Sequence, residues 1–288
     1  MLHLKRNSKR ALAHGRICVP WVLVFICALN LAFFGIQGKV SADENRFPFS
    51  PGEKLTMKVR WGVIPAGEAT LEVMPQEVIN GTKSHHFVLT VKTTPFVDFF
   101  YKVRDRIDSY ADMNMTRSTL YKKTKRGLKK KDIIVNFDWQ KQVARYSNLM
   151  RKGKRRHRKP IHILRGTLDP MSIFYAFRLQ VLEIDKVLEC PVTDGKKCVI
   201  GKARIVRREK MQLAGMTFDT FLVQPDLKHL EGIFEQSRDA TLKVWVTADE
   251  RKIPVRIESK VVVGSFIGEL ASIENNGKIE LLIEKKTK

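Results

Sequence analysis

One stretch decides the fold: residues 240–270, which read ATLKVWVTADERKIPVRIESKVVVGSFIGEL. It contains two runs in which apolar and polar residues alternate, joined by a short polar turn. In the first run Leu242, Val244 and Val246 point to one side of an extended strand, while the residues between them point to the other side. The second run, residues 253–257, repeats this two-residue period. The stretch therefore predicts a β-hairpin, one face of which is covered by other parts of the protein.

The same two-residue period recurs through most of the chain, first at residues 55–61 and then at 69–73. Asn80 and Gly81 separate two alternating runs, which is a strong hairpin signal because both central residues of such a turn need positive φ. We also expect strands at 103–111, 119–124, 132–138, 142–149, 203–209 and 217–224. The pattern predicts a mainly β protein: a curved antiparallel sheet or half-open barrel with one amphipathic helix packed on it, preceded by an N-terminal signal segment.

The helix is expected at residues 170–182, because Asp169 can accept hydrogen bonds from the first free amides and Pro170 suits the first helical position. Residues 95–101, PFVDFFY, are apolar without a two-residue period and indicate either a short helix or a loop. Aromatic residues gather in these two segments, where they either fill the core or line an apolar cavity for an acyl chain. The candidate cavity residues are Phe96, Phe99, Phe100, Ile173, Phe174 and Phe177.

The N-terminus carries the features of a secretory signal. Residues 1–16 contain five Lys and Arg and no acidic residue, residues 17–36 are apolar, and Val40 and Ala42 mark a small-residue cleavage site. The alternative is a retained inner-membrane anchor, since about 20 apolar residues span a bilayer. We predict a periplasmic protein with a signal peptide at 1–42, a lead-in at 43–52, a single β-rich domain at 53–274 and a charged tail at 275–288.

The chain is strongly basic, with 53 Lys and Arg against 30 Asp and Glu and a formal net charge of +23. Removing residues 1–42 takes away six basic and no acidic residues, which leaves +17. A charge of this size attracts polyanions. Behind a secretion signal these are phospholipid headgroups, lipopolysaccharide phosphates and acidic polymers. We therefore expect an anionic envelope lipid or polymer, and not a nucleic acid, as a partner.

Two basic clusters concentrate this charge, at residues 122–131 and 151–160. They are either contacts to an anionic envelope surface or ordinary solvated loops that join strands. The candidate contacts are Lys122, Lys123, Lys125, Arg126, Lys129, Lys130, Lys131, Arg151, Lys152, Lys154, Arg155, Arg156, Arg158 and Lys159.

Export also affects what the cysteines are expected to do. Cys18 and Cys27 lie in the signal, which leaves Cys190 and Cys198 as a pair in an oxidising compartment. A three-residue turn at 193–195 would set Cys190 directly opposite Cys198 on a hairpin. Opposed residues lie about 4.5 to 5.5 Å apart at Cα, within the range of a disulfide. We therefore predict a disulfide between Cys190 and Cys198.

The sequence contains no motif of a known catalytic class. It has no G-x-S-x-G, no H-E-x-x-H, no phosphate-binding glycine loop and no dinucleotide fingerprint. His85 and His86 are adjacent in an expected strand and face opposite sides, so they cannot bind one metal together. Asp105, Asp108 and Asp112 indicate ion pairing on strands rather than catalytic carboxylates. We predict no catalytic, cofactor-binding or metal-binding residues and no cofactor.

Three stretches together resemble a known family. They are FSPGEKLTMKVRWGVIPAGEATLEV near the start, TLDPMSIFYAFR in the middle and LKVWVTADERKIPVRIESKVVVGSFIGEL near the end. In this order they are similar to the bacterial exported family catalogued as domain of unknown function 3108. The resemblance implies an envelope protein of mostly β structure. It implies no catalytic residues, because the family has no agreed activity.

Three functions remain open at this point. The first is a non-enzymatic periplasmic protein whose curved sheet shelters a lipid or other hydrophobic moiety while its basic loops contact anionic envelope surfaces. The second is an envelope assembly or scaffolding factor that binds an unknown protein partner or an acidic polymer. The third is a hydrolase of envelope glycans or lipids, which requires Asp, His or Tyr side chains that converge in a pocket.

Overall fold

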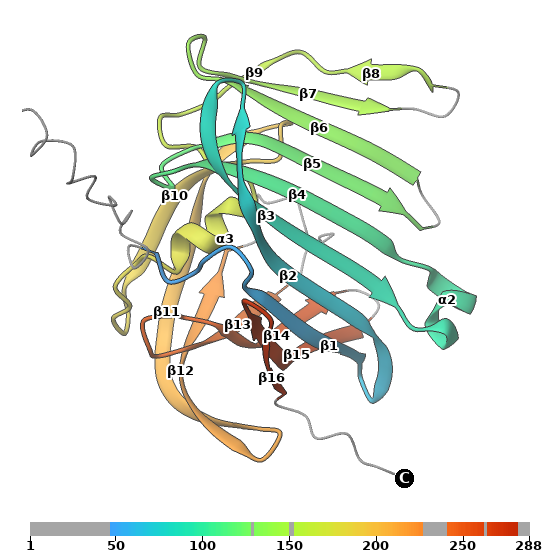
Figure 1. Ribbon diagram of the computed structural model, residues 1–288, viewed down its shortest axis with the longest axis vertical. Coiled ribbons are helices and arrows are strands. Elements are labelled where there is room, and N and C mark those ends of the chain that lie inside the picture. Colours follow the sequence, from blue (N-terminus) through green and yellow to red (C-terminus); the bar gives the residue numbers. More distant parts are fainter. Residues whose placement is uncertain (1–46, 128–129, 150–152, 227–240, 262–263, 282–288) are drawn as a thin grey trace, which may run out of the picture. The chain divides into compact units, whose positions relative to one another are not determined.

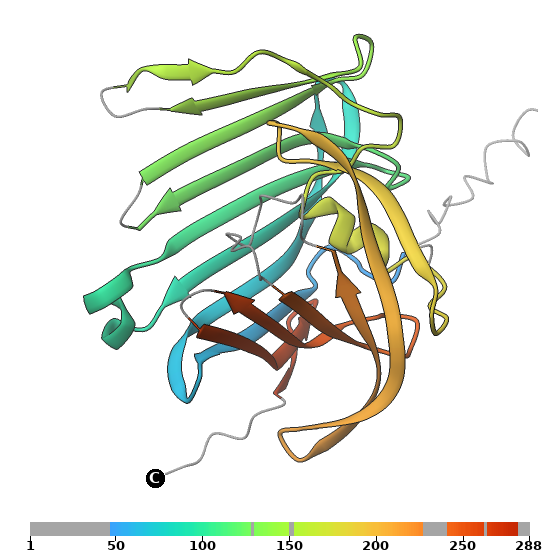
Figure 2. The ribbon, with the colours of Figure 1, turned by 180° about the vertical axis from the view of Figure 1, so that it is seen from behind.

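Strands dominate the computed structural model, which describes residues 47–127, 130–149, 153–226, 241–261 and 264–281. All of these residues lie in one unit, Asn45–Lys288. In this part of the chain sixteen strands form one antiparallel sheet, accompanied by the helices α2 and α3 (Figure 1). The sheet is strongly curved and does not close, because its strand order ends at β10 on one side and at β8 on the other (Figure 2). The predicted fold class is confirmed, and the expected signal peptide at 1–42 lies outside the described residues.

The first half of the sheet is a series of hairpins in chain order. At its β2–β3 turn Asn80 and Gly81 have φ of 50° and 78°, as the sequence predicts. The strands are β1 Lys54–Trp61, β2 Ile64–Ile79, β3 Thr82–Thr93, β4 Arg104–Asp112, β5 Ser118–Arg126, β6 Lys130–Asp138, β7 Val143–Leu149, β8 Arg155–His157 and β9 Ile161–His162.

The second half continues the sheet from the other side of β1. Its strands are β10 Val187–Thr193, β11 Cys198–Leu213, β12 Met216–Pro225, β13 Thr241–Thr247, β14 Pro254–Val261, β15 Gly264–Asn275 and β16 Lys278–Leu281. Because β15 pairs with β1 along its whole length, the two halves of the chain form one continuous sheet. The predicted hairpin is β13–β14, in which Val244 lies opposite Ile257.

The expectation of a single covered face is wrong for β13. Leu242 and Val246 are buried on one side, but Trp245 and Thr247 are buried as well. The register shift between Trp245 and Val246 leaves Val255 of β14 unpaired, and such a bulge increases the local twist of the two strands. Trp245 belongs to the main core, whereas Val246 packs in a second, smaller cluster with Ile205. Both faces of β13 therefore contribute to the interior.

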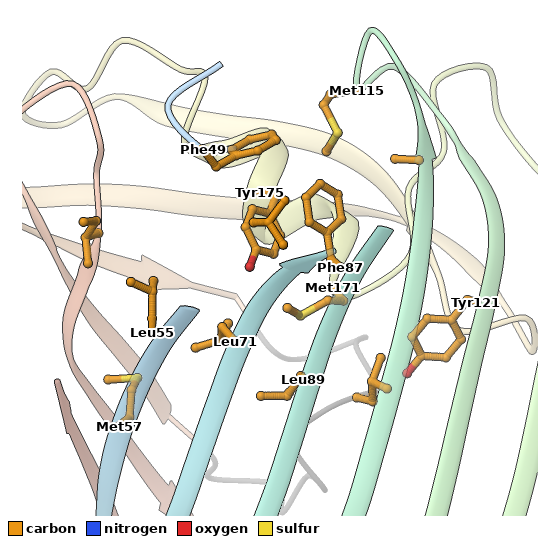
Figure 3. Packing of buried hydrophobic residues seen from close by; sticks show 14 of the residues in the cluster. Phe49, Leu55, Met57, Leu71, Phe87, Leu89, Met115, Tyr121, Met171 and Tyr175 are labelled. Carbon is orange, nitrogen blue, oxygen red and sulfur yellow. The ribbon is translucent and has the colours of Figure 1, made fainter. Parts of the chain in front are cut away.

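The helix α3, Ser172–Phe177, is shorter than the predicted 170–182 and lies on the concave side of the sheet (Figure 1). Oδ1 of Asp169 accepts hydrogen bonds from the amides of Met171 and Ser172, both at 2.9 Å, so the expected capping is present. The ring of Tyr175 stacks on Phe87 of β3 with centroids 3.8 Å apart. Figure 3 shows this contact at the centre of the core, and the helix thus fills the concave face at its own end.

The second helix, α2, is residues Pro95–Tyr101, the segment for which the sequence left helix and loop open. Oγ1 of Thr94 caps it by accepting a hydrogen bond from the amide of Val97. It follows β3 and lies at the opposite end of that strand from α3 (Figure 1). The helix buries none of its residues.

Candidate functional site

The three stretches that carry the family resemblance meet at Arg178, whose side chain is fully buried. Its guanidinium donates two hydrogen bonds to the carboxylate of Glu53, at 2.6 and 3.0 Å. It also donates to the carbonyl oxygens of Arg251 and Pro48, each at 2.8 Å. Glu53, Arg178 and Arg251 come from the first, second and third stretch respectively. This bidentate pair ties the end of α3 to the start of the sheet, a role that the sequence does not reveal.

Asp169 forms a second group of buried hydrogen bonds, at the start of α3. Its carboxylate accepts hydrogen bonds from the hydroxyl groups of Ser109, Ser118 and Ser172 at 2.6 to 2.8 Å. All four side chains are completely buried. These residues are inaccessible to a substrate, and the arrangement fixes the turn that leads into α3 on β4 and β5.

The concave face next to α3 is apolar, and its composition changes along the strands. Alternate residues of β2 to β7 face this side, and the strand register sorts them into rows that cross the sheet. The row nearest α3 is Val73, Phe87, Ser109, Tyr121, Val135 and Tyr146. The middle row is Leu71, Leu89, Ile107, Lys123, Ile133 and Asn148. The row nearest α2 is Ala69, Val91, Asp105, Lys125 and Lys131.

Charge therefore increases toward the α2 end of the concave face. Lys125 lies directly between Asp105 on β4 and Lys131 on β6, and its Nζ is 3.9 Å from Oδ2 of Asp105. Lys125 is half-buried and Lys131 is exposed. Lys123 is only 6% exposed, so its predicted role as a contact on an outer anionic surface is wrong. The reason is the two-residue period, which turns Lys123 to the same side as Tyr121.

The hydroxyl group of Tyr121 is a hydrogen-bond donor on this face. Its side chain is 2% exposed, and its hydroxyl group has no hydrogen-bond partner in the described part of the chain. Burial raises the pKa of this hydroxyl well above its usual value, so it stays protonated. In Figure 3 the Tyr121 hydroxyl points away from Met115. It points along the sheet in the direction from Phe87 to Leu89 of β3, and α2 follows the end of that strand.

The comparison with family models gives one match, to a protein family of unknown function, DUF3108, over residues 56–271. The chain belongs to this family. The resemblance inferred from the three stretches is confirmed. A comparison with curated proteins finds no match.

Among the solved structures that resemble this DUF3108 chain are the following two. One is a β-barrel-like protein of the domain of unknown function DUF1849 from Brucella abortus, with 9% identity and a TM-score of 0.50, covering 79% of this chain and 99% of that one. The other is described as a putative lipoprotein from Parabacteroides distasonis, with 9% identity and a TM-score of 0.31, covering 82% and 98% of the two chains. The first likeness shows a common fold.

The other basic candidates of this DUF3108 protein are divided between the α2 end of the sheet, the middle of β5 and the segment around β8. Lys130, like Lys131, is exposed, and Arg126 pairs with Asp132 at 2.7 Å. Lys122 is half-buried with its Nζ 5.6 Å from the centroid of the Tyr110 ring. The exposed members of the second cluster are Lys154, Arg155, Arg156, Arg158 and Lys159. Lys129, Arg151 and Lys152 lie outside the described residues.

The structure does not bring the two aromatic segments of the candidate cavity together. Phe174 and Phe177 pack against the buried clusters beside α3, where Ile173 is half-buried. The aromatic side chains of α2 are exposed at the far end of the sheet: Phe96 by 63%, Phe99 by 86% and Phe100 by 67%. The two segments follow different strands and do not meet. Among the described residues a cavity of about 220 Å³ lies elsewhere, lined by Glu53, Arg251, Ile253, Ile273, Asn275, Lys278 and Ile279.

The predicted disulfide is absent, and Cys190 and Cys198 are free thiols. The hairpin loop is residues 194–197, which starts one residue later and is one residue longer than expected, so Cys198 lies opposite Thr193 and Cys190 opposite Gly201. A displacement of three residues along a strand is about 10 Å, beyond the Cα separation of a disulfide. Burial raises the pKa of the Cys190 thiol to about 11, which also disfavours its oxidation.

The predicted ion pairing on β4 is confirmed. Asp108 binds Arg106 and Nε2 of His86, and Asp112 lies 3.6 Å from Arg117. Within the described ranges no three His, Cys, Asp or Glu side chains are grouped closely enough to hold a metal ion. The described helices of this DUF3108 protein are also too short or too polar to span a bilayer.

Proposed function

We propose that this DUF3108 protein is a non-enzymatic periplasmic protein that binds an amphiphilic lipid with an anionic headgroup on the concave face of its sheet. The observation that carries the proposal is the change along this face from apolar rows beside α3 to the Lys125 and Lys131 row beside α2. An acyl chain would lie along the apolar rows, where each buried methylene contributes about 0.8 kcal/mol. The headgroup would lie among the lysines.

Tyr121 supports this orientation of the lipid. Its hydroxyl is a buried, protonated donor that points toward the charged end. Leaving such a group without a partner costs about 1 to 3 kcal/mol, which an oxygen of a bound headgroup would recover. The concave face thus offers one hydrogen bond, the exposed Lys131 and the Asp105-paired Lys125 to a carboxylate or phosphate, and an apolar surface to the chain attached to it.

The test uses cis-parinaric acid, whose fluorescence rises in an apolar environment, with the full chain. We expect binding, and about fivefold weaker binding for Lys131→Ala, because one lysine near an anion contributes about 1 kcal/mol. Lys130→Ala is the matched control, since Lys130 is equally exposed on the same strand but faces the other side of the sheet. Methyl parinarate, which lacks the charge, should bind wild type and Lys131→Ala alike. Absence of binding, or equal effects of both substitutions, contradicts the proposal.

The open ends of the sheet favour a second candidate, a scaffold that pairs with a strand of another envelope protein. The strand order ends at β8, a short basic strand with exposed side chains, and at β10, whose edge is bridged by Leu168 at Val192 and otherwise ends the sheet. Unpaired strand edges are templates for a partner's strand. Crosslinking in cells that recovers one stoichiometric protein partner through β8 or β10, together with no binding of cis-parinaric acid, would favour the scaffold over lipid binding.

A further inference from the structure

The helix α2 displays aromatic side chains to water. Phe96, Phe99, Phe100 and Tyr101 are exposed by 63%, 86%, 67% and 55%. The Phe100 ring contacts those of Phe96 and Phe99, with centroids 5.8 and 5.1 Å apart, so the side chains form one continuous patch. Contiguous apolar patches of this kind on a folded protein mark interaction sites.

The orientation of α2 is fixed from within the protein. Its one acidic residue, Asp98, turns inward and binds the guanidinium of Arg104 through two hydrogen bonds of 3.0 and 2.6 Å. The hydroxyl of Thr93 donates to the same carboxylate, and these contacts lower the pKa of Asp98. An ordinary surface helix turns its apolar side to the protein and its charges to water. In α2 the aromatic side chains face water and the acidic side chain faces the protein. The contacts of Asp98 therefore keep the aromatic side chains exposed.

The aromatic patch extends to the neighbouring β1–β2 turn. The amide of Thr94 donates to the carbonyl of Ala66 at 2.9 Å, and its hydroxyl donates to the carbonyl of Pro65 at 3.1 Å. These bonds hold the start of α2 beside the turn. Val63, at the tip of this turn, is 91% exposed. Two separate segments therefore present apolar side chains at the same end of the sheet.

Basic residues flank this patch. The β5–β6 turn packs against the segment that follows α2, so closely that a Cβ added at Gly127 would lie 2.2 Å from the carbonyl oxygen of Lys102. Lys102, Lys130 and Lys131 are all exposed there. The end of β7 and the start of β8 lie at the same end, since Leu149 pairs with both Asp132 and Arg155. The acidic side chains at this end are paired with basic ones: Asp98 and Asp132 with arginine, and Asp105 and Glu68 with lysine.

We propose that this end of the sheet docks on the surface of an anionic phospholipid bilayer. Aromatic side chains favour the boundary between headgroups and acyl chains, and flanking lysine and arginine residues bind lipid phosphates. The arrangement of an aromatic centre within a basic surround matches an anionic bilayer in both polarity and charge. A second copy of this chain would bring two strongly basic surfaces together, which the net charge opposes. Docking does not depend on lipid binding inside the sheet.

The experiment measures flotation of the full chain with vesicles of phosphatidylcholine and phosphatidylglycerol, and with vesicles of phosphatidylcholine alone. We expect the triple variant Phe96→Ser, Phe99→Ser, Phe100→Ser to bind the anionic vesicles at least about tenfold more weakly than wild type. Val78→Ser is the control, because Val78 is 68% exposed but lies near the β2–β3 turn at the other end of these strands. High salt should weaken wild-type binding.

Wild type and the triple variant both carry the N-terminal segment. Hydroxyl-radical footprinting distinguishes vesicle binding through α2 from vesicle binding through that segment. On anionic vesicles the oxidation of Phe99, Phe100 and Tyr101 should fall in wild type, and circular dichroism should show that the triple variant is folded. Unchanged oxidation of these residues on the vesicles overturns the proposal, even if the chain floats. Equal binding to neutral vesicles overturns the requirement for anionic lipid. A wild-type dimer that the triple variant converts to a monomer assigns the patch to self-association instead.

Discussion

The residue that the fold depends on most is Arg178. Four of its five N–H donors bind two carboxylate oxygens and two backbone carbonyls, and its guanidinium lies 5.6 Å from the ring centroids of Phe49 and Tyr175. A buried charge of this kind is stable only while its partners are present. Glu53, Arg178 and Arg251 lie one in each of the three stretches that resemble the family, and their mutual contacts hold α3 against the sheet.

Removing one partner of this pair should destabilise the protein strongly. We expect Glu53→Gln to lower the free energy of unfolding by about 3 to 5 kcal/mol, because it leaves the guanidinium buried without its counter-charge. Arg208→Ala is the control, since the Arg208–Asp219 pair is about half exposed on both sides and contributes less than about 1 kcal/mol. Urea unfolding followed by circular dichroism measures both. Equal losses would show that burial does not distinguish the two pairs.

Asp108 makes the stability depend on pH. Burial opposes its ionisation, but hydrogen bonds from His86 and Arg106 outweigh burial and lower its pKa from 3.8 to about 2. A lowered folded-state pKa stabilises the protein above the unfolded-state value, and this contribution is lost as the pH falls from about 4 to about 2. The difference in unfolding free energy between wild type and Asp108→Asn should therefore shrink by about 2 kcal/mol over this window. A difference that is constant with pH would contradict the assignment.

At the scale of elements, the sheet depends on close contacts between particular strands. At Gly67, a bulge-free pairing with Thr93 brings β2 so close to β3 that a Cβ would lie 2.3 Å from the carbonyl oxygen of Lys92. That oxygen belongs to the backbone and cannot rotate away. The same end of β3 leads into α2, so the packing here also positions the helix.

Gly67→Ala should separate the two strands locally. We expect a loss of about 1 to 3 kcal/mol in the free energy of unfolding, as for other overpacked interior sites. Gly215→Ala provides the comparison, because Gly215 has a φ of 79° but no atom within 4 Å of an added Cβ, so only its backbone conformation is strained. Hydrogen exchange should accelerate at the β2–β3 ends for Gly67→Ala alone. Unchanged exchange there would show that the strands absorb the methyl group.

At the scale of the whole described sheet, the pairing of β1 with β15 makes the two halves of the chain interdependent. The main core contains residues from both halves, including Leu55 and Leu270. A continuous core and an uninterrupted strand order favour one cooperative unfolding transition.

Two tryptophans can report this cooperativity. Trp139 lies beside the β6–β7 turn and Trp245 lies in β13, in the two different halves. In a chain in which Trp21 and Trp61 are replaced by Phe, adding Trp139→Phe or Trp245→Phe leaves one tryptophan in one half. The fluorescence change of each variant should follow the same urea dependence as its circular dichroism. Separate fluorescence and circular dichroism midpoints within one variant would instead indicate that the halves unfold independently.

The sequence alone determined the strands, the β2–β3 turn and the capping by Asp169, because each depends on residues a few positions apart. Alternation places side chains on two faces, Asn80 and Gly81 supply positive φ, and a carboxylate accepts the first amides of a helix. The same patterns found the family resemblance but not its physical basis.

Only the tertiary structure decided which residues meet. Glu53 and Arg178 are far apart in the chain, and the charged row of Lys125 and Lys131 exists only because the register of several strand pairs aligns it with Asp105. The hairpin loop begins one residue later and is one residue longer than predicted, and together these changes separate Cys190 from Cys198 along their hairpin. The composition of PFVDFFY could not tell an inward from an outward helix, since the contact between Asp98 and Arg104 sets its orientation. Local patterns fix what each segment forms, whereas long-range register and packing fix where its side chains lie.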